Sequence, residues 1–325
     1  MLGTHVRYRL YILGAAVLFS TGGAAIKACM LTGWQVAAAR SAVAAIMLWL
    51  ALPASRRAWD RRTWLVGSSY AATLVLFVLA NKLTTAANTI FLQSTAPLYV
   101  LGLGGVVLGE RATRRDFGFM ALIAAGLALF FVGGEPARAT APNPLLGNVL
   151  AAVAGVTWGL TLIGLRLAGR AATDRAAGCQ AGARPEGMAA AADPGLGAVV
   201  VGNGLACAVC LPFALAPRLL GSTAVATSAG FGRPLDLLLV VYLGVVQIGL
   251  AYVLLTRGLR TVPALEGSLL ILLEPALNPL WAWLLEREIP SSSALLGGVA
   301  ILGATVARSV TSPAAISPAQ PRAAP

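Results

Sequence analysis

Residues 94–111, STAPLYVLGLGGVVLGER, and residues 272–288, LLEPALNPLWAWLLERE, share one spacing. In the first stretch Pro97 precedes Glu110 by 13 residues, and in the second Pro275 precedes Glu288 by 13 residues. Each stretch runs from a proline through apolar residues to a glutamate. This shared pattern indicates two copies of one structural unit.

Composition places both copies in a lipid bilayer. Hydrophobic residues make up 58% of the chain, charged residues only 11%, and the mean hydropathy is +0.80, which lies outside the range of soluble domains. Ten continuous apolar runs of roughly 17–22 residues, the last one shorter, match the length of a helix that crosses about 30 Å of hydrocarbon. Strands of a membrane barrel would alternate apolar and polar residues instead. The predicted fold class is therefore an all-α membrane protein with ten transmembrane helices: Leu10 to Met30, Trp34 to Pro53, Trp64 to Ala80, Thr89 to Gly109, Phe117 to Gly134, Leu145 to Ala168, Leu196 to Ala216, Leu235 to Thr256, Gly267 to Leu285 and Ala294 to Ser309.

The charge of +12 does not indicate a nucleic-acid partner, because the cations are spread over loops and are not gathered on one solvated face. Seventeen of the 24 Lys and Arg residues fall in the segments on the side of the two termini, and five fall in the opposite segments. By the positive-inside rule we expect both termini in the cytoplasm and a location in the cell inner membrane. The first run also has the pattern of a signal peptide. We expect it to stay as the first helix, because it has a partner later in the chain.

That partner is one of two further matches between the halves. Phe19 and Lys27 are 8 residues apart, as are Trp158 and Arg166, and NKLTTAAN at 81–88 resembles RGLRTVPA at 257–264. We therefore predict two five-helix repeats. An odd number of passes per repeat inverts the second copy in the membrane, an arrangement typical of secondary transporters. The expected segments are a first repeat at 8–135, a linker at 136–143, a second repeat at 144–310 with a long cytoplasmic loop at 169–195, and a disordered tail at 311–325.

Four segments together resemble the drug/metabolite transporter superfamily in its ten-helix EamA-type branch. They are TTAANTIFLQSTAPLYVLGLGGVVLGE (84–110), LLILLEPALNPLWAWLLERE (269–288), VAGVTWGL (153–160) and the arginine in VAAARSAVAAIMLWLALP (36–53). The resemblance implies paired five-helix repeats, a central cavity and alternating access. It implies no particular substrate, since relatives move amino acids, nucleosides, sugars, polyamines or drugs.

An embedded enzyme is the main rival class, and the sequence offers little for catalysis. His5, the only histidine, lies in the polar N-terminal tail, which removes Ser/His, Cys/His and most zinc arrangements. Cys207 and Cys210 have metal-like spacing but lie in an apolar run without other ligands. Neither lysine follows a glycine, so there is no Walker A sequence. We expect no enzyme, no metal and no cofactor.

Polar residues inside the apolar runs are the candidates for substrate binding, because a charge in hydrocarbon needs a cavity or a partner. Lys27 and Arg40 lie towards the outer side, and sequence offers no acid beside them. Lys27 can also snorkel to the interface. Arg40 can also form an internal ion pair or a helix-end contact.

Glu274 is the one deep acid, and Pro275 after it lets the helix bend and leaves a carbonyl free beside the carboxylate. Glu274 can instead be a structural partner of a cation or carry a proton. Gln93, Gln247 and Asn278 can bind the substrate or join helices. Trp158 is a core aromatic by type, and the resemblance adds a cavity-facing position. Pro97 and Pro275 are the predicted bending and gating residues.

Glu110 and Glu288 end their helices, where the macrodipole disfavours an anion, so we expect each in a structural ion pair. Taken together, the sequence predicts a secondary transporter, an exporter or permease for a small metabolite such as an amino acid or related organic anion. The alternative is a membrane sensor or assembly partner with the same fold. The lipid bilayer and the substrate are the expected partners, and a homodimer stays open.

Overall fold

The computed structural model describes residues 2–56, 59–107, 114–129, 131, 136–180, 194–219, 233–287 and 290–311. This part of the chain is helical throughout, and its only β-type pairing is an isolated bridge between Arg138 and Ala141. The first half contains α1 (Leu2–Ser20), α2 (Gly22–Ala28), α3 (Gly33–Ala51), η1 (Pro53–Arg56), α4 (Arg61–Leu83), α5 (Ala86–Gln93), α6 (Ala96–Val107) and α7 (Arg114–Leu129). The second half contains α8 (Pro144–Gln180), α9 (Pro194–Leu219), α10 (Pro234–Tyr242), η3 (Leu243–Leu250), α11 (Ala251–Leu259), α12 (Ala264–Leu270), α13 (Leu273–Glu286) and α14 (Ser292–Thr311).

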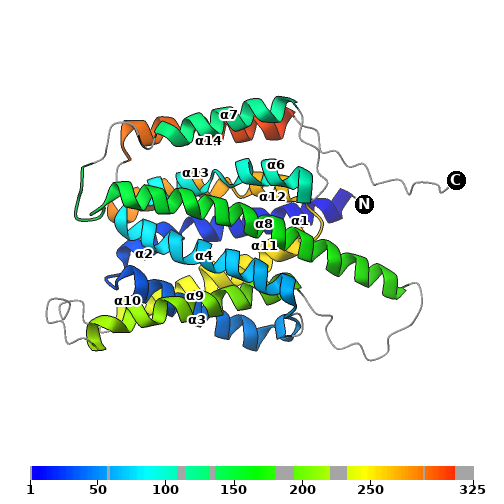
Figure 1. The fold of residues 1–325 in the computed structure, drawn as a ribbon, viewed down its shortest axis with the longest axis horizontal. Coiled ribbons are helices and arrows are strands. Elements are labelled where there is room, and N and C mark those ends of the chain that lie inside the picture. The colour runs from blue at the N-terminus through cyan, green and yellow to red at the C-terminus, as the bar shows by residue number, and fades with distance from the viewer. Residues whose placement is uncertain are drawn as a thin grey trace.

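These helices form ten passes, because three pairs and one triplet of elements each continue one pass. The compound passes are α1–α2, α5–α6, α10–η3–α11 and α12–α13. Among the described residues, seven segments are long and apolar enough to cross a membrane, and α7 and α14 contain shorter apolar helices. The predicted fold class is confirmed. In Figure 1, α1 begins and α14 ends at the same end of the bundle, as ten passes require.

Contacts between the halves follow the inverted repeat. The second pass, α3, packs on its counterpart α9, and the fifth pass, α7, packs on its counterpart α14. The contact of α4 with α8 is mirrored by that of α11 with α1, since each joins a third pass to the first pass of the other repeat. In Figure 1, α7 and α14 form the upper layer and α3 and α9 lie at the bottom. The remaining passes lie between these two self-paired layers.

Polar side chains set where several helices begin. Thr32 accepts a hydrogen bond from the backbone of Gln35, whose side chain accepts one from the backbone of Thr32 in return, so α3 starts with a capping box. Asp60 caps α4, and Thr85 caps α5. Asp60 lies just before the apolar run of the third pass. Caps of this kind accept hydrogen bonds from the first backbone N–H groups of a helix, which have no partner within the helix.

Three passes are interrupted near their middle, a feature that the sequence predicted only at the two prolines. In the first pass, the hydroxyl groups of Ser20 and Thr21 donate to the carbonyls of Val17 and Leu18. In the fourth, Ser94 and Thr95 donate in the same way to Ile90 and Leu92. Side chains that bond to the preceding turn bend helices.

The ninth pass is interrupted at Ile271 and Leu272, where α12 ends and α13 has not begun. Pro275 has no N–H to continue the ladder, so the carbonyl of Ile271 accepts from the backbone of Glu274 at 2.8 Å instead. The sequence predicted a free carbonyl beside Glu274, and for the carbonyl of Ile271 this prediction was wrong. The chain forms a tighter turn there, in which the backbone N–H of Glu274 donates to that carbonyl.

Two stretches differ from the sequence expectation in their helical form. The eighth pass contains the π-helix η3 between two α-helices, a form that occurs often at functional sites. The helix α8 continues to Gln180, so residues 169–180 are helical where a loop was expected. They are rich in alanine, which favours helix, and contain no proline.

Gly202 allows α9 and α4 to approach closely, and we predict that Gly202→Ala destabilises the protein. A Cβ atom at this position would lie 2.7 Å from the carbonyl oxygen of Gly67 and would also overlap the ring of Tyr70. Forced overpacking of this kind costs about 1–3 kcal/mol. The measurement is the thermal unfolding of the purified protein in detergent.

Gly204 provides the matched control for this prediction. It lies on the same helix two residues further on, and a Cβ there would meet no atom within 4 Å. Gly204→Ala should therefore leave the melting temperature unchanged or raise it, because alanine favours helix. Equal melting temperatures for the two variants would contradict the tight contact at Gly202.

Candidate functional site

A central cavity lies between the two halves of the chain. Its lining comes from α1, α3, α4 and α5 on one side and from α8, η3, α11 and α13 on the other. The space open to water-sized molecules is about 30 Å³, which holds roughly two water molecules. Its lining residues are Phe19, Arg40, Thr73, Leu74, Phe77, Gln93, Trp158, Gln247, Ile248, Tyr252 and Glu274.

Among the residues that the structure describes, Arg40 is the only cation that lines this cavity. It lies on α3, and 1% of its surface is exposed. One guanidinium nitrogen, Nη2, donates to the carbonyl of Leu74 at 3.1 Å, and Nε has no hydrogen-bond partner. The ion pair between Arg9 and Glu266 lies outside the cavity, and no acid among the described residues forms an ion pair with Arg40. Arg40 is thus a buried cation without an anionic partner, which is costly unless a ligand supplies one.

Glu274 lies in the first turn of α13 and is the only acid in the cavity lining within the described part of the chain. Its side chain is 8% exposed, and it forms no ion pair with any residue that the structure describes. The start of a helix favours a negative charge, because backbone N–H groups and the macrodipole point there. Arg40 and Glu274 therefore bring a guanidinium and a carboxyl group into one cavity, and the structure shows no ion pair between them.

Two glutamine side chains add amide groups to the polar lining. Gln93 is the last residue of α5, just before the interruption of the fourth pass, and Gln247 lies on the π-helix η3. Both side chains are nearly buried, and the oxygen Oε1 of each has no hydrogen-bond partner. Buried amide oxygens are normally paired, so these two acceptors are available to a molecule in the cavity.

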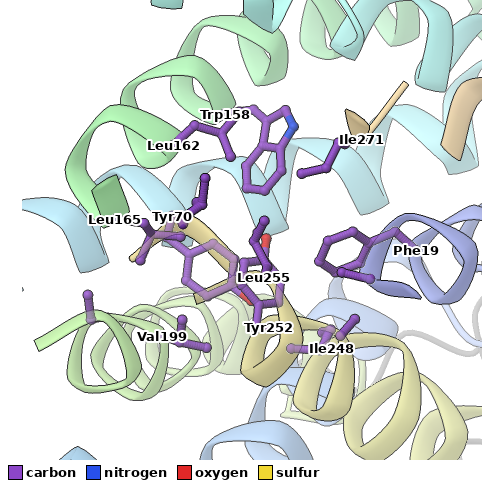
Figure 2. Packing of buried hydrophobic residues seen from close by; sticks show 14 of the residues in the cluster. Phe19, Tyr70, Trp158, Leu162, Leu165, Val199, Ile248, Tyr252, Leu255 and Ile271 are labelled. Carbon is purple, nitrogen blue, oxygen red and sulfur yellow. The ribbon is translucent and has the colours of Figure 1, made fainter. Parts of the chain in front are cut away.

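Aromatic rings form the apolar wall. Figure 2 shows the rings of Phe19, Trp158 and Tyr252 turned toward one another from three different helices. The centroid of the Phe19 ring lies 6.3 Å from that of Trp158 and 4.9 Å from that of Tyr252, both in edge-to-face geometry. Tyr70 packs behind Tyr252 at 4.5 Å, and its hydroxyl accepts from Asn203. The wall is held in place by packing from α4 and α9.

A second, smaller cavity lies between the interruptions of the fourth and ninth passes. It shares Gln93, Trp158 and Glu274 with the central cavity. Pro97 and Pro275 also line it, each in the first turn of the helix that follows an interruption. The two predicted bending residues, one from each repeat, thus line the same small cavity. Their role in gating stays a prediction.

Lys27 does not line either cavity. Its ammonium group donates to the carbonyls of Thr84, at 2.7 Å, and Thr140. Arg166, its counterpart in the second repeat, donates to the carbonyls of Leu259 and Arg260 at 2.8 Å each. Thr84 and Arg260 occupy equivalent positions in the two matched stretches at the ends of the third and eighth passes. Each cation donates to a carbonyl at the C-terminal end of a helix, α4 for Lys27 and α11 for Arg166, where positive charge is favoured.

We therefore predict that Lys27→Met destabilises the protein and leaves substrate affinity unchanged. The methionine keeps most of the apolar stem but removes the charge and the donors, and a hydrogen bond to a charged group is worth about 1.5–3 kcal/mol. The measurements are the melting temperature and the KM of transport. An increased KM at an unchanged melting temperature would instead assign Lys27 to the substrate.

Asn278 also lies outside both cavities, although it is completely buried. Its amide Nδ2 donates to the carbonyl of Ser20 at 3.0 Å, and Trp281 donates to the hydroxyl of the same serine. Gly23 allows this approach, because a Cβ there would lie 2.8 Å from that amide nitrogen. Asn278 thus joins α13 to the interruption in the first pass.

Sequence reasoning missed several lining residues, namely Phe19, Thr73, Phe77 and Tyr252 as site residues. Their types are common in transmembrane cores, so no signal distinguished them, apart from the spacing of Phe19 in the repeat match. The predicted structural ion pairs of Glu110 and Glu288 lie outside the described residues. Within those residues no group of three His, Cys, Asp or Glu side chains is placed to hold a metal ion.

The fold and cavity define a multi-pass membrane protein whose polar site lies at the interface of two inverted repeats, the arrangement of a secondary transporter. The model of the EamA-like transporter family matches residues 7–132 and again residues 190–309. Together these matches cover more than half of the chain. The chain belongs to the EamA-like transporter family, and it is a membrane transporter of the drug/metabolite transporter type.

Comparison with solved structures supports the same fold. A structure titled "Crystal structure of protein" is similar with a TM-score of 0.59 and 18% sequence identity. The match covers 94% of this chain and 99% of the other. At this identity the likeness shows the fold alone. A search of curated proteins found no match.

Proposed function

We propose that this transporter moves a small metabolite with a negatively charged group, such as an amino acid or a related organic anion, by alternating access. The direction we propose is export, and Arg40 binds the negative group. The unpaired burial of Arg40 is the observation that carries the proposal: a guanidinium that is 1% exposed lines the cavity and has no carboxylate within ion-pair distance among the described residues.

A carboxylate suits this cation better than other ligands do. A guanidinium presents parallel N–H donors that match the two oxygens of a carboxylate. Arg40 already uses Nη2 for Leu74, and Nε remains without a partner. A ligand carboxylate at this side of the group would satisfy the donor and neutralise the charge together.

The size of the cavity supports alternating access. Space for roughly two water molecules is too small for an amino acid, so the passes around the cavity must move apart to admit one. The interrupted helices provide places where the passes can bend to widen it. In many transporters, discontinuous helices at the repeat interface surround the substrate site.

Net flux tests the proposal against the alternative of a sensor. Purified protein is reconstituted in liposomes loaded with a mixture of small carboxylic acids and amino acids, and the release of each is followed. We expect release of at least one acid, but not of its amide analogue, above that from protein-free liposomes. Binding of an acid without net release would favour the sensor, and equal release of acid and amide would contradict a role for the negative charge.

The orientation of the chain in the cell membrane belongs to the same proposal. We predict that a reporter active only in the cytoplasm is active when fused after Arg62 or Arg115 and silent when fused after Ala137. The distribution of cations between the two sides supports cytoplasmic termini and an inner-membrane location. Activity after Ala137 would contradict the proposed orientation.

A further inference from the structure

The turn between the second and third passes, residues 49–64, combines exposed tryptophans with exposed arginines. We call it the Trp/Arg turn, and its described members are Trp49, Arg56, Trp59, Arg61, Arg62 and Trp64. The three tryptophans are 43–47% exposed, and the three arginines are exposed as well. In Figure 1 the turn lies at the end of the bundle where α1 begins. Large aromatic rings and cations thus share one surface at the end of the passes.

Hydrogen bonds and ring contacts hold this turn in a defined shape. The Nε atom of Arg56 donates to the carbonyl of Trp49 at 2.6 Å, and its guanidinium lies 4.4 Å from the centroid of the Trp49 ring. The indole N–H of Trp59 donates to the carbonyl of Ser55 at 2.9 Å. The rings of Trp59 and Trp64 meet edge to face, with their centroids 6.2 Å apart. A surface that is already ordered loses little entropy when it binds a ligand.

Arg61 and Arg62 receive no stabilisation from the helix that they begin. They lie in the first turn of α4, where the macrodipole disfavours cations. Neither forms an ion pair with an acid that the structure describes. The corresponding turn of the second repeat, residues 220–232, contains no lysine, arginine or tryptophan, so the fold does not need them there. Both arginines therefore favour an anion from outside the chain.

The neighbouring apolar surface identifies that anion as a lipid. Ile46 and Leu50 on α3 and Leu65 on α4 are 58–64% exposed, and both helices belong to spans that can cross the membrane. Acyl chains therefore cover these side chains. Tryptophan prefers the level of the lipid headgroups. In the proposed orientation the turn faces the cytoplasmic leaflet, whose anionic lipids attract clusters of Lys and Arg. A phospholipid matches both the apolar and the cationic part, whereas a free phosphate matches only the second.

We propose that the Trp/Arg turn binds the headgroup of an anionic phospholipid, with Arg61 and Arg62 at the phosphate and the rings of Trp59 and Trp64 beside it. The site lies outside the central cavity, so it does not depend on the proposed substrate. The lipid contacts the end of α3 and the start of α4. These two helices carry Arg40 and the carbonyl to which it donates, so the bound lipid braces the helix pair that holds the cavity cation.

Wild-type protein can test the preference for an anionic headgroup without any mutation. The protein is reconstituted in phosphatidylcholine vesicles, and phosphatidylglycerol or phosphatidylcholine with brominated acyl chains is added at equal mole fraction. Bromine quenches tryptophan fluorescence on contact, so the two titrations give the relative affinity of the headgroups. One cation near an anionic surface strengthens binding about fivefold, so we expect at least this preference for phosphatidylglycerol. Equal quenching by the two lipids overturns the proposal.

Two further measurements identify the place and the source of the anion. Replacing Trp49, Trp59 and Trp64 together by phenylalanine should remove the part of the quenching that depends on the headgroup, and its persistence would place the lipid elsewhere and overturn the proposal. Inorganic phosphate should not displace the brominated phosphatidylglycerol more than chloride does at equal ionic strength. Specific displacement by phosphate would show a site for a free anion and overturn the lipid.

A matched pair of double variants separates this site from the general positive charge of the same side. Arg61→Gln/Arg62→Gln should lower the preference for phosphatidylglycerol at least fivefold. Arg114→Gln/Arg115→Gln also removes two exposed arginines from the first turn of a helix, α7, but this helix contains no tryptophan, and we expect it to keep the wild-type preference. Circular dichroism checks that both variants fold. Equal loss in the two, or no loss in the first, overturns the proposal.

Discussion

Arg40→Ala lowers the rate of substrate transport in proteoliposomes by roughly a hundredfold or more, and Arg40→Lys lowers it by roughly tenfold. Removing one partner of a buried, hydrogen-bonded charge pair costs about 2–5 kcal/mol, and each 1.4 kcal/mol is a factor of about ten. Lysine restores the charge as a single point but cannot present two parallel donors to a carboxylate. Transport should therefore fall in the order arginine, lysine, alanine.

A structural role of Arg40 would give a different result. Its hydrogen bond to the carbonyl of Leu74 joins α3 to α4, so loss of folding must be measured beside loss of transport. The comparison of an acidic substrate with its amide analogue decides between the two roles. If both compounds lose transport equally in Arg40→Lys, the contact with a negative group is contradicted.

Arg9 offers a matched control for the removal of a cation. It forms an exposed ion pair with Glu266 at 2.6 Å, outside the cavity. Exposed pairs contribute about 0–1 kcal/mol, so Arg9→Ala should transport at nearly the wild-type rate. A large loss in this variant would show that net charge, rather than the cavity cation, controls transport.

The sequence was sufficient for the features that follow from repetition and hydropathy. Apolar length and matched spacings predicted the passes, and the cost of burying charge directed attention to Arg40 and Glu274. The structure brings five of the seven candidate side chains to the cavity: Arg40, Gln93, Trp158, Gln247 and Glu274. Their substrate contacts stay a proposal.

Other features depend on which way a helix faces, and composition does not carry that information. Lys27 and Arg40 look alike as lone cations in apolar runs, yet of the two only Arg40 lines the cavity, whereas Lys27 reaches the C-terminus of α4. The π-helix around Gln247 and the interruption at Thr21 contain no proline, so nothing in the sequence indicated either. At the interruption in the first pass, the hydroxyl groups of Ser20 and Thr21 bond to carbonyls of the preceding turn.

Pro275→Ala should slow transport by roughly tenfold while the protein still folds and binds substrate. In the structure the carbonyl of Ile271 accepts from Glu274 because residue 275 has no N–H. Alanine supplies that N–H, which can then bond to Ile271 and extend an unbroken helix through the interruption between α12 and α13. A stiffer ninth pass resists the bending that opens and closes the cavity, and such steps limit turnover in many proteins. The measurement is the rate of flux at saturating substrate.

Pro279 makes this test specific, because it lies in the same helix α13 four residues further on and lines neither cavity. Pro279→Ala also restores an N–H, but inside an element that is already continuous, so we expect a much smaller effect on the flux. Both variants should keep or raise the melting temperature, since a proline inside a helix is unfavourable. Equal slowing by the two substitutions would contradict a special role of the interruption, and unchanged flux in Pro275→Ala would make that proline merely structural.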